Sequence, residues 1–297
     1  MHKLVVILGT NASGKSALGI RLAEHFGGEV VSADSRQVYR GLNLGTGKIT
    51  PEQAGTVRHH LIDVADVAER YVLTQYQAQA YAAIDGILAA GRRPFLVGGT
   101  GLYINAVVYG YVLVDAPPQA ELRAELEQMS VPALVERLRQ LDPDAIGHID
   151  QNNPRRLVRA IEIAAAGHTH AATRQRHPRY EVLQLGLTWE RDELDRRIEF
   201  RLADRLAQGM IEEVVALRAS GVSDTRLDEL GLEYRYITRF LRGEIASQAE
   251  LFQQLKIAIH QYARRQQTWF RRNPDVNWLD ATGDYFAQAR DLIAKWY

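Results

Sequence analysis

Leu4-Val5-Val6-Ile7-Leu8 leads directly into Gly9-Thr10-Asn11-Ala12-Ser13-Gly14-Lys15-Ser16, and a helical stretch follows. The apolar run is typical of a buried parallel strand. The octapeptide has the G-x-x-x-x-G-K-[ST] pattern of a phosphate-binding loop (P-loop) in its strand–loop–helix context. Its glycines let successive N–H groups converge on a phosphate, Lys15 adds a mobile charge, and Ser16 offers a hydroxyl to Mg²⁺. The sequence therefore predicts a site for a phosphorylated ligand.

Short apolar runs and helical patterns alternate along the chain. Strands are expected at Glu29–Ala33, His59–Val64, Arg93–Val97, Val182–Trp189 and Trp278-Leu279, and helices at Ser16–Phe26, Tyr71–Ala90, Arg191–Ala219 and Gln248–Phe270. Strands that alternate with helices of this length form parallel sheets with right-handed crossovers. We therefore predict an α/β fold, with a P-loop parallel-sheet core and helices on both faces.

The pattern changes after Val114. Pro117-Pro118 interrupt the chain, and Gln119–Gly167 shows several short helical patterns with no strand between them. We expect a catalytic core made of residues 1–114 and 181–297, interrupted by a helical insertion domain at 115–180.

The composition is that of an ordinary globular protein, with 46% hydrophobic and 24% charged residues and no cysteine. A chain without cysteine has no disulfide, thiolate metal site or cysteine nucleophile. No apolar run reaches the roughly 18 residues of a membrane span, and no signal-peptide pattern precedes the first strand. We expect a cytoplasmic protein that binds no membrane.

Basic residues are concentrated in two stretches, although the 36 basic and 36 acidic residues balance overall. Gln151–Tyr180 holds six arginines against one acid, and Leu255–Asn273 holds five basic residues and no acid, interleaved with aromatic rings. Such stretches are typical of polyanion binding, and solvated helix faces would give the same pattern.

Three polar segments follow predicted strands, where open α/β sheets bind ligands. In Asp34-Ser35-Arg36-Gln37 the carboxylate is a candidate general base or Mg²⁺ partner, or else a turn cap. Gly98-Gly99-Thr100-Gly101 presents N–H groups and a hydroxyl, or else simply begins a helix. His59-His60 would point in different directions on a strand, which makes them a poor metal pair.

Taken together and in this order, these segments resemble the tRNA dimethylallyltransferase (isopentenyl-tRNA transferase) family over nearly the whole chain. The matching segments are Gly9–Ser16, Asp34–Gly41, Gly45–Lys48, His60–Asp63, Val97–Tyr103, Pro154–Arg159, Arg197–Glu199, Arg264–Gln266 and Thr268-Trp269. Two segments depart from the family. Thr10-Asn11 stand where Pro-Thr is usual, and Gly231-Leu232-Glu233-Tyr234-Arg235 replaces a Gly-Tyr-Lys element that contacts tRNA.

The resemblance implies transfer of a dimethylallyl group from dimethylallyl diphosphate to the exocyclic amine of the adenosine 3′ of the anticodon in tRNA. It implies that the donor diphosphate, rather than the ATP that the motif also suggests, occupies the loop Gly9–Ser16. Lys15, Arg201 and Mg²⁺ held through Ser16 would stabilise its charge. Asp34, assisted by Thr100, would take the amine proton from a base flipped out of its loop.

The resemblance also implies which residues contact tRNA. They are Asp34, Ser35, Arg36, Gln37 and Thr100 in the core, and Arg123, Arg155, Arg156, Leu157, Val158 and Arg159 in the insertion, which would hold the anticodon stem-loop. The protein is expected to act as a monomer.

Three other functions remain open on the residues alone. An adenylate isopentenyltransferase would use a free nucleotide, which does not need the insertion or the basic C-terminal helix. A P-loop small-molecule kinase would not need the Asp34–Gln37 segment or the arginine clusters. A non-catalytic RNA-binding protein would not need Lys15, Ser16 and Asp34 together.

Overall fold

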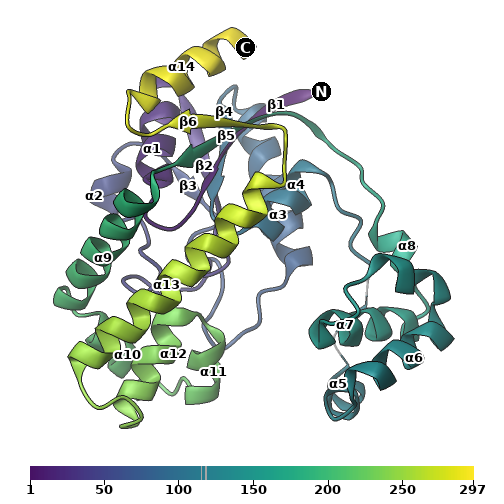
Figure 1. The fold of residues 1–297 in the computed structure, drawn as a ribbon. Helices are drawn as coiled ribbons and strands as arrows, with labels where there is room; N and C mark the ends of the chain where they lie inside the picture. Colours follow the sequence, from purple (N-terminus) through teal and green to yellow (C-terminus); the bar gives the residue numbers. More distant parts are fainter. Residues whose placement is uncertain (115, 118) are drawn as a thin grey trace. The chain divides into compact units, whose positions relative to one another are not determined.

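The computed structural model describes residues 1–114, 116–117 and 119–297 and divides them into two compact units (Figure 1). The first unit combines Met1–Val108 with Tyr180–Tyr297, and the second is Tyr109–Arg179. Residue 115, at which we placed the start of the insertion, and Pro118 of the Pro117-Pro118 pair lie outside the described residues.

The first unit is built on a six-stranded parallel sheet with the order β3-β2-β4-β1-β5-β6. The strands are β1 (His2–Gly9), β2 (Gly28–Ala33), β3 (His59–His60), β4 (Arg93–Gly98), β5 (Tyr180–Thr188) and β6 (Val276–Asp280). β1 lies between β4 and β5, and its residues Leu4–Leu8 are at most 1% exposed. The predicted parallel α/β core is confirmed.

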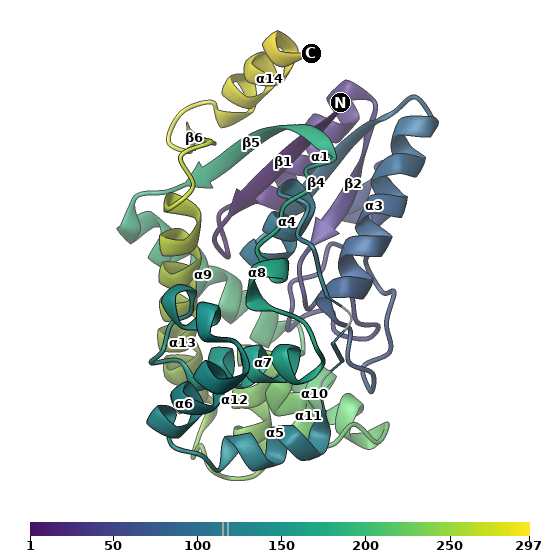
Figure 2. The ribbon, with the colours of Figure 1, turned by 90° about the vertical axis from the view of Figure 1, so that its right-hand side faces the viewer.

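Helices cover both faces of this sheet (Figures 1 and 2). Val5 and Ile7 of β1 share a hydrophobic cluster with helices α1 (Lys15–Phe26) and α14 (Tyr285–Trp296). Alternate residues of a strand point to opposite faces, so Leu4, Val6 and Leu8 face the other side. Helices α3 (Leu73–Ala89), α4 (Gly101–Val108) and α13 (Gln248–Arg271) pack there.

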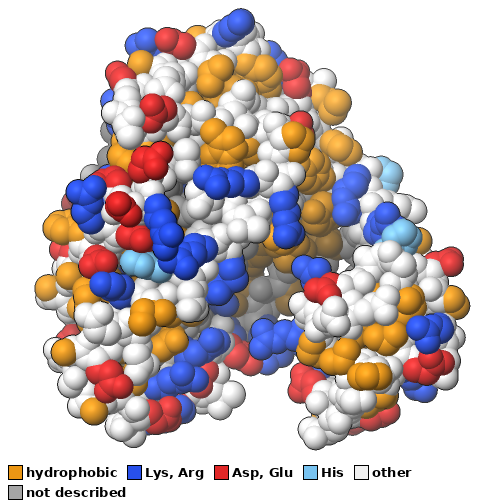
Figure 3. Space-filling view, viewed as in Figure 1, with side chains coloured by type: hydrophobic (Ala, Val, Ile, Leu, Met, Phe, Trp, Pro, Cys, Tyr) orange, Lys and Arg blue, Asp and Glu red, His pale blue; other side chains and the backbone are white. Residues whose placement is uncertain are grey.

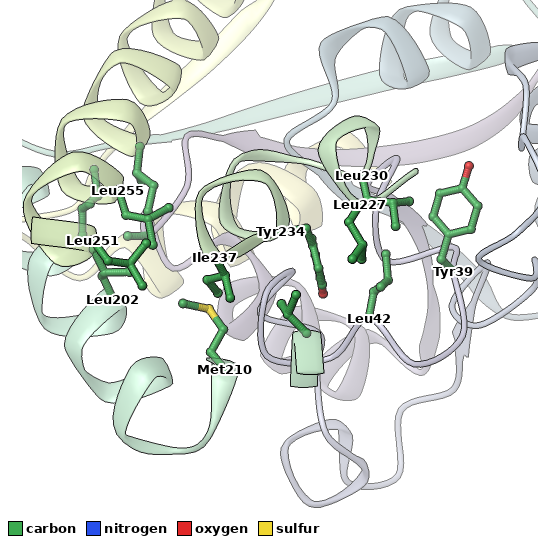
Figure 4. Close-up of a cluster of buried hydrophobic side chains, with 14 of the residues drawn as sticks. Tyr39, Leu42, Leu202, Met210, Leu227, Leu230, Tyr234, Ile237, Leu251 and Leu255 are labelled. Carbon is green, nitrogen blue, oxygen red and sulfur yellow. The ribbon is translucent and has the colours of Figure 1, made fainter. Parts of the chain in front are cut away.

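A helical layer lies beyond the carboxyl ends of the strands in the first unit. It comprises α9 (Arg191–Ala207), α10 (Met210–Ala219), α11 (Asp224–Glu229), α12 (Leu232–Leu241) and the N-terminal part of α13. Their apolar side chains enclose Tyr39 and Leu42 from the loop after β2 (Figure 4). Burial of these two side chains fixes the loop that carries Asp34–Gln37 against the helices.

The second unit is helical. It contains α5 (Ala120–Glu127), α6 (Val131–Leu141), the 3₁₀ helix η1 (Pro143–His148), α7 (Pro154–Ala165) and α8 (His170–Thr173). Leu126, Leu138, Leu157 and Ile161 form its core and are fully buried.

Two expected elements were wrong in extent. The strand predicted at His59–Val64 has only two residues, because Leu61 and Asp63 adopt φ of 62° and 56°, outside the extended region. The helix predicted at Arg191–Ala219 is divided into α9 and α10 at Gly209, whose φ is 100°. The short helix α2 (Pro51–Ala54), α11, α12 and α14 were not predicted. No helix in the described ranges has the length and apolarity needed to cross a membrane.

Candidate active site

The P-loop connects β1 to α1 in the turn that the glycines predict. Ala12 and Gly14 have positive φ of 61° and 93°. A Cβ at Gly9 would lie 2.8 Å from Ser13 Oγ and 2.9 Å from the Leu187 carbonyl oxygen, so only glycine fits there. The turn is therefore fixed by close approach of the backbone as well as by its left-handed residues.

Two side chains bond to backbone carbonyls of the P-loop; Trp189 lies between β5 and α9, and Arg197 lies on α9. Trp189 Nε1 donates to the Ser13 carbonyl at 2.7 Å, and Arg197 Nε donates to the Ala12 carbonyl at 3.0 Å. The Arg197 guanidinium also lies 4.2 Å from the centre of the Trp189 ring. The sequence pattern singled out Arg197, but Trp189 was missed as a site residue because nothing in its own segment marks it as a partner of the loop.

Lys15 and Arg201 supply positive charge beside the loop. Lys15 Nζ donates to the Thr10 carbonyl at 3.1 Å. Desolvation lowers the pKa of Lys15 to about 8, opposed by the charge of Asp34 and assisted by that of Arg201. The Arg201 side chain has no ion-pair or hydrogen-bond partner among the described residues. A cation without a protein partner beside a P-loop is suited to bind a phosphate oxygen.

Further arginines on α9 surround Arg201. Loss of water around its guanidinium, followed by the charge of Arg205, lowers the pKa of Arg201. Arg205 is itself occupied, because it donates to the Leu44 and Gly45 carbonyls at 3.1 and 3.2 Å. On the surface of the first unit, Lys and Arg side chains lie along α13, and over α9 they are mixed with Asp and Glu (Figure 3).

Asp34 and Thr100 lie next to each other at the ends of β2 and β4. Asp34 Oδ1 accepts hydrogen bonds from the amides of Arg36 at 2.8 Å and Gln37 at 3.4 Å. Thr100 Oγ1 accepts from the Ser35 amide at 3.0 Å and lies 3.3 Å from Ser35 Oγ. Asp34 therefore caps a turn, as one reading of the sequence held, while Oδ2 has no partner in the described part of the chain. Thr100 contacts the segment that carries Asp34, not the carboxylate itself.

The loop between Asn43 and Lys48 is held by partly buried acidic side chains and a buried tyrosine that the sequence did not indicate. Glu213 accepts from the amides of Asn43, Leu44 and Gly45 at 2.7–3.0 Å and from the Tyr234 hydroxyl at 2.8 Å. Glu233 lies 3.5 Å from Arg205, and burial raises its pKa. Glu233 and Tyr234 belong to the segment that departs from the family. The Tyr234 ring lies against Gly45 of this loop, and Glu233 is linked to the loop through Arg205.

The two histidines on β3 are part of the fold. His60 Nε2 lies 2.6 Å from Glu29 Oε2, and His59 Nδ1 lies 2.9 Å from the Val57 carbonyl. Across the described ranges, no group of three or more His, Asp or Glu side chains could hold a metal ion. Lys48 Nζ, 2.5 Å from Asp63 Oδ1, joins the loop after β2 to the segment after β3.

Mg²⁺ in a P-loop site needs few protein ligands, because phosphate and water oxygens complete its shell. The Ser16 side chain is exposed, and its hydroxyl has no partner among the described residues. The Ser16 hydroxyl, together with phosphate and water oxygens, therefore fits the coordination of a phosphate-bound Mg²⁺.

In the second unit, only some of the α7 residues that were predicted to contact tRNA are exposed to solvent. Leu157 and Val158 are buried, with exposed fractions of 0% and 6%, and their side chains belong to the core of this unit, so their contact with tRNA stays a prediction and would have to go through the backbone. Arg155 and Arg156 are exposed and have no side-chain partner in the described ranges. Arg159 lies 3.4 Å from the buried Glu162.

The comparisons with known proteins agree with these motifs. The family model for IPP transferase matches residues 37–273. A tRNA dimethylallyltransferase 2 of Citrifermentans bemidjiense is 43% identical over 98% of this chain and 95% of its own. A full-length tRNA isopentenylpyrophosphate transferase from Bacillus halodurans superposes with a TM-score of 0.76 at 36% identity, covering 99% of this chain and 96% of that one.

A eukaryotic dimethylallyltransferase acting on tRNA superposes with a TM-score of 0.84 at 25% identity, over 99% of this chain and 80% of that one. The resemblance drawn from the sequence motifs is confirmed. The chain belongs to the IPP transferase family, the prenyl-group transferases that modify tRNA.

Proposed function

We propose that this chain transfers the dimethylallyl group of dimethylallyl diphosphate to the exocyclic amine of the adenosine 3′ of the anticodon in tRNA. The observation that carries the proposal is the placement of a P-loop lysine and a carboxylate at one edge of the sheet. Lys15 follows β1, Asp34 follows β2, and their charges interact. The reaction needs both groups, one at the leaving diphosphate and one at the amine.

The leaving diphosphate would bind at the P-loop between Lys15 and Arg201. Positive charge develops on the allylic carbon as the C–O bond breaks, and negative charge develops on the diphosphate. Fixed cations and N–H groups that stabilise the leaving group therefore lower the barrier. Mg²⁺ held through Ser16 would supply further positive charge to the diphosphate.

The attacking amine must lose a proton, and Asp34 is the group proposed to take it. Hydrogen bonds from two backbone amides hold Oδ1 and orient the carboxylate, while Oδ2 is left for the substrate. Thr100 would act as a positioning residue, because its hydroxyl holds the Ser35 amide beside Asp34. Arg36 and Gln37, in the same segment, would contact the tRNA.

The tRNA would contact the helical unit through the exposed Arg155 and Arg156, with Arg159 adding charge on the same helix. The target adenine would leave its stack to reach Asp34. We propose that the protein acts as a monomer in the cytoplasm. A free adenine nucleotide would need neither the helical unit nor the basic face of α13, which favours tRNA over adenylate as the acceptor.

One assay tests the proposal. The protein is incubated with dimethylallyl diphosphate, Mg²⁺ and unmodified tRNA, and the tRNA is digested and analysed by mass spectrometry. The expected product is an adenosine that carries the added prenyl mass next to the anticodon. Two parallel reactions test the alternatives. AMP replaces tRNA as the acceptor to detect an adenylate prenyltransferase, and ATP replaces dimethylallyl diphosphate as the donor to detect a kinase. Product in either of those reactions and none on tRNA would overturn the proposal.

A further inference from the structure

We infer that Gln266 is a positioning residue that fixes the P-loop against the loop carrying Thr100. It thereby sets the distance between Lys15, at the leaving diphosphate, and Asp34, at the attacking amine. The inference rests on the proposed function for the identity of those groups. Gln266 lies on α13, far in sequence from either loop, and is 6% exposed.

The two ends of one side-chain amide contact the two loops. Gln266 Oε1 accepts a hydrogen bond from the Asn11 amide at 2.9 Å. Gln266 Nε2 donates to the Gly99 carbonyl at 3.0 Å. One planar group thus joins the loop after β1 to the loop after β4. The bond to the Gly99 carbonyl is buried and the bond to the Asn11 amide is partly buried, so removal of the side-chain amide leaves both backbone groups without this partner.

Glycines in the loop after β4 allow α13 to come this close. A Cβ at Gly99 would lie 2.7 Å from Gln266 Nε2 and 3.4 Å from Lys15 Cε. A Cβ at Gly101 would lie 2.3 Å from Trp269 Nε1, one turn along the same helix. The Gly98–Gly101 segment is therefore shaped to admit α13, which supplies the link between the loops.

Each end of the link continues to a proposed site residue. On one side, Gly99 precedes Thr100, whose amide donates to the Ala33 carbonyl at 3.1 Å and whose hydroxyl holds Ser35, next to Asp34. On the other side, Asn11 follows Thr10, whose carbonyl accepts from Lys15 Nζ. A shift in Gln266 would change the separation of Lys15 and Asp34.

The chemistry of the link requires a neutral amide. One end must accept a proton from an N–H, and the other must donate one to a carbonyl. A carboxylate of the same size can accept from Asn11 but cannot donate to Gly99, and it places a negative charge beside the phosphate loop. A leucine of similar size can do neither. The departure at Asn11 does not disturb the link, because only its backbone amide takes part.

The experiment compares Gln266→Glu with Gln267→Glu, a matched control that adds the same charge at the next, half-buried position on α13. Gln267 has no side-chain partner in the described part of the chain. Affinity for inorganic diphosphate with Mg²⁺ is measured by calorimetry without tRNA. We expect Gln266→Glu to weaken binding by at least about 10-fold, on the scale of one charged hydrogen bond, and Gln267→Glu to change it by less than about 3-fold. Equal affinities for the two variants would overturn the inference.

Gln266→Leu tests the link without adding charge. Single-turnover prenyl transfer at saturating donor and tRNA should fall by roughly 10-fold or more, because misplacement of reacting groups slows the chemical step. A rate equal to that of the wild type in a folded Gln266→Leu would contradict the inference. Should that variant not fold, Gln266→Asn, whose shorter amide cannot reach both loops, replaces it with the same criterion.

A failed link and a failed function give different results. Wild-type protein that does not modify tRNA contradicts the proposed function, and the diphosphate titration still decides the role of Gln266. Wild-type transfer together with unaffected Gln266 variants contradicts the link alone.

Discussion

Arg123 and Glu162 form a two-point ion pair in the helical unit, with Nη2 2.7 Å from Oε2 and Nε 3.1 Å from Oε1. The Glu162 side chain is completely buried, and it also accepts from the Gln119 amide at 3.3 Å. A buried carboxylate is costly unless it is paired and hydrogen-bonded. Arg123, which the resemblance assigned to tRNA, is therefore first of all the partner of this carboxylate.

Replacement of Arg123 by alanine should destabilise the helical unit, because it leaves the buried Glu162 carboxylate with the more distant Arg159 as its charged partner and with the hydrogen bond from the Gln119 amide. We expect a loss of roughly 3 kcal/mol in the free energy of unfolding, as for other buried pairs that lose one member. Urea unfolding followed by circular dichroism measures it. Arg155→Ala, which removes an exposed and unpaired arginine from the same unit, should change it by less than about 0.5 kcal/mol. Equal free energies of unfolding for the Arg123→Ala and Arg155→Ala variants would show that the Arg123–Glu162 pair contributes little to stability.

The sequence predicted the parts of the site that local patterns encode. The P-loop, the position of Asp34 after β2 and that of Thr100 after β4 follow from strand, glycine and polar residues within a few positions of one another. Because the carboxyl ends of parallel strands meet at one edge, their proximity could also be foreseen.

The parts that were missed depend on contacts between distant segments. Glu162 lies 39 residues from Arg123 and Gln266 lies 255 from Asn11, and nothing near either pair in sequence marks its partner. Gly209 was missed as a helix end because a single glycine in a helical pattern does not require a break. Its positive φ, which divides α9 from α10, appears only in the fold.

Lys15→Ala should lower prenyl transfer by at least about 10²-fold, since it removes one charged contact to the leaving diphosphate. The Lys15 side chain is only half-buried and bonds to one carbonyl, so circular dichroism should be unchanged. Steady-state transfer to tRNA measures the effect. A rate near that of the wild type would place the diphosphate elsewhere.

Asp34→Asn should reduce the chemical step by roughly 10²–10⁴-fold, the usual contribution of a general base. The amide keeps an oxygen for the Arg36 and Gln37 amides, so the turn should survive. Single-turnover kinetics with pre-bound tRNA isolate the step, and donor and tRNA affinities should stay within a few-fold. An unchanged single-turnover rate would leave Asp34 with its turn-capping role alone.

Glu29 should make stability depend on pH in the acid range. Burial alone would raise its pKa, but the hydrogen bond with His60 and the charges of His60 and Arg92 lower it below the ordinary 4.5. Arg58 acts in the same direction. A lowered carboxyl pKa gives stability that is fully present above the unfolded value and is lost as pH falls through the folded value.

Thermal unfolding of wild type and Glu29→Gln between about pH 3 and 7 checks this dependence. The wild type should be the more stable protein near neutral pH, and the difference should shrink as the pH falls below 4.5. A difference that stays constant with pH would show that the charge of Glu29 is not what stabilises the β2–β3 edge.

Arg155 and Arg156 provide the clearest test of the RNA surface, because both are exposed and neither has a protein partner among the described residues. If they bind phosphates, their replacement by alanine should weaken tRNA binding and reduce the salt dependence. Each lost phosphate contact should lower the slope of log affinity against log salt by about 0.9 on duplex and about 0.7 on single-stranded segments. Diphosphate binding at the P-loop should not change.

Titration of unmodified tRNA at several salt concentrations measures the slope of log affinity against log salt for the wild type and for the Arg155→Ala/Arg156→Ala variant. The double variant Arg137→Ala/Arg139→Ala is the control, since it removes two exposed arginines from α6 in the same unit and changes no residue of α7; of the two, Arg139 is paired with the exposed Glu136. This control should leave the slope within error of the wild type if the contacts are specific to α7. A slope that is unchanged in the α7 double variant would show that these arginines are only solvated, and the RNA surface would then have to lie on other residues.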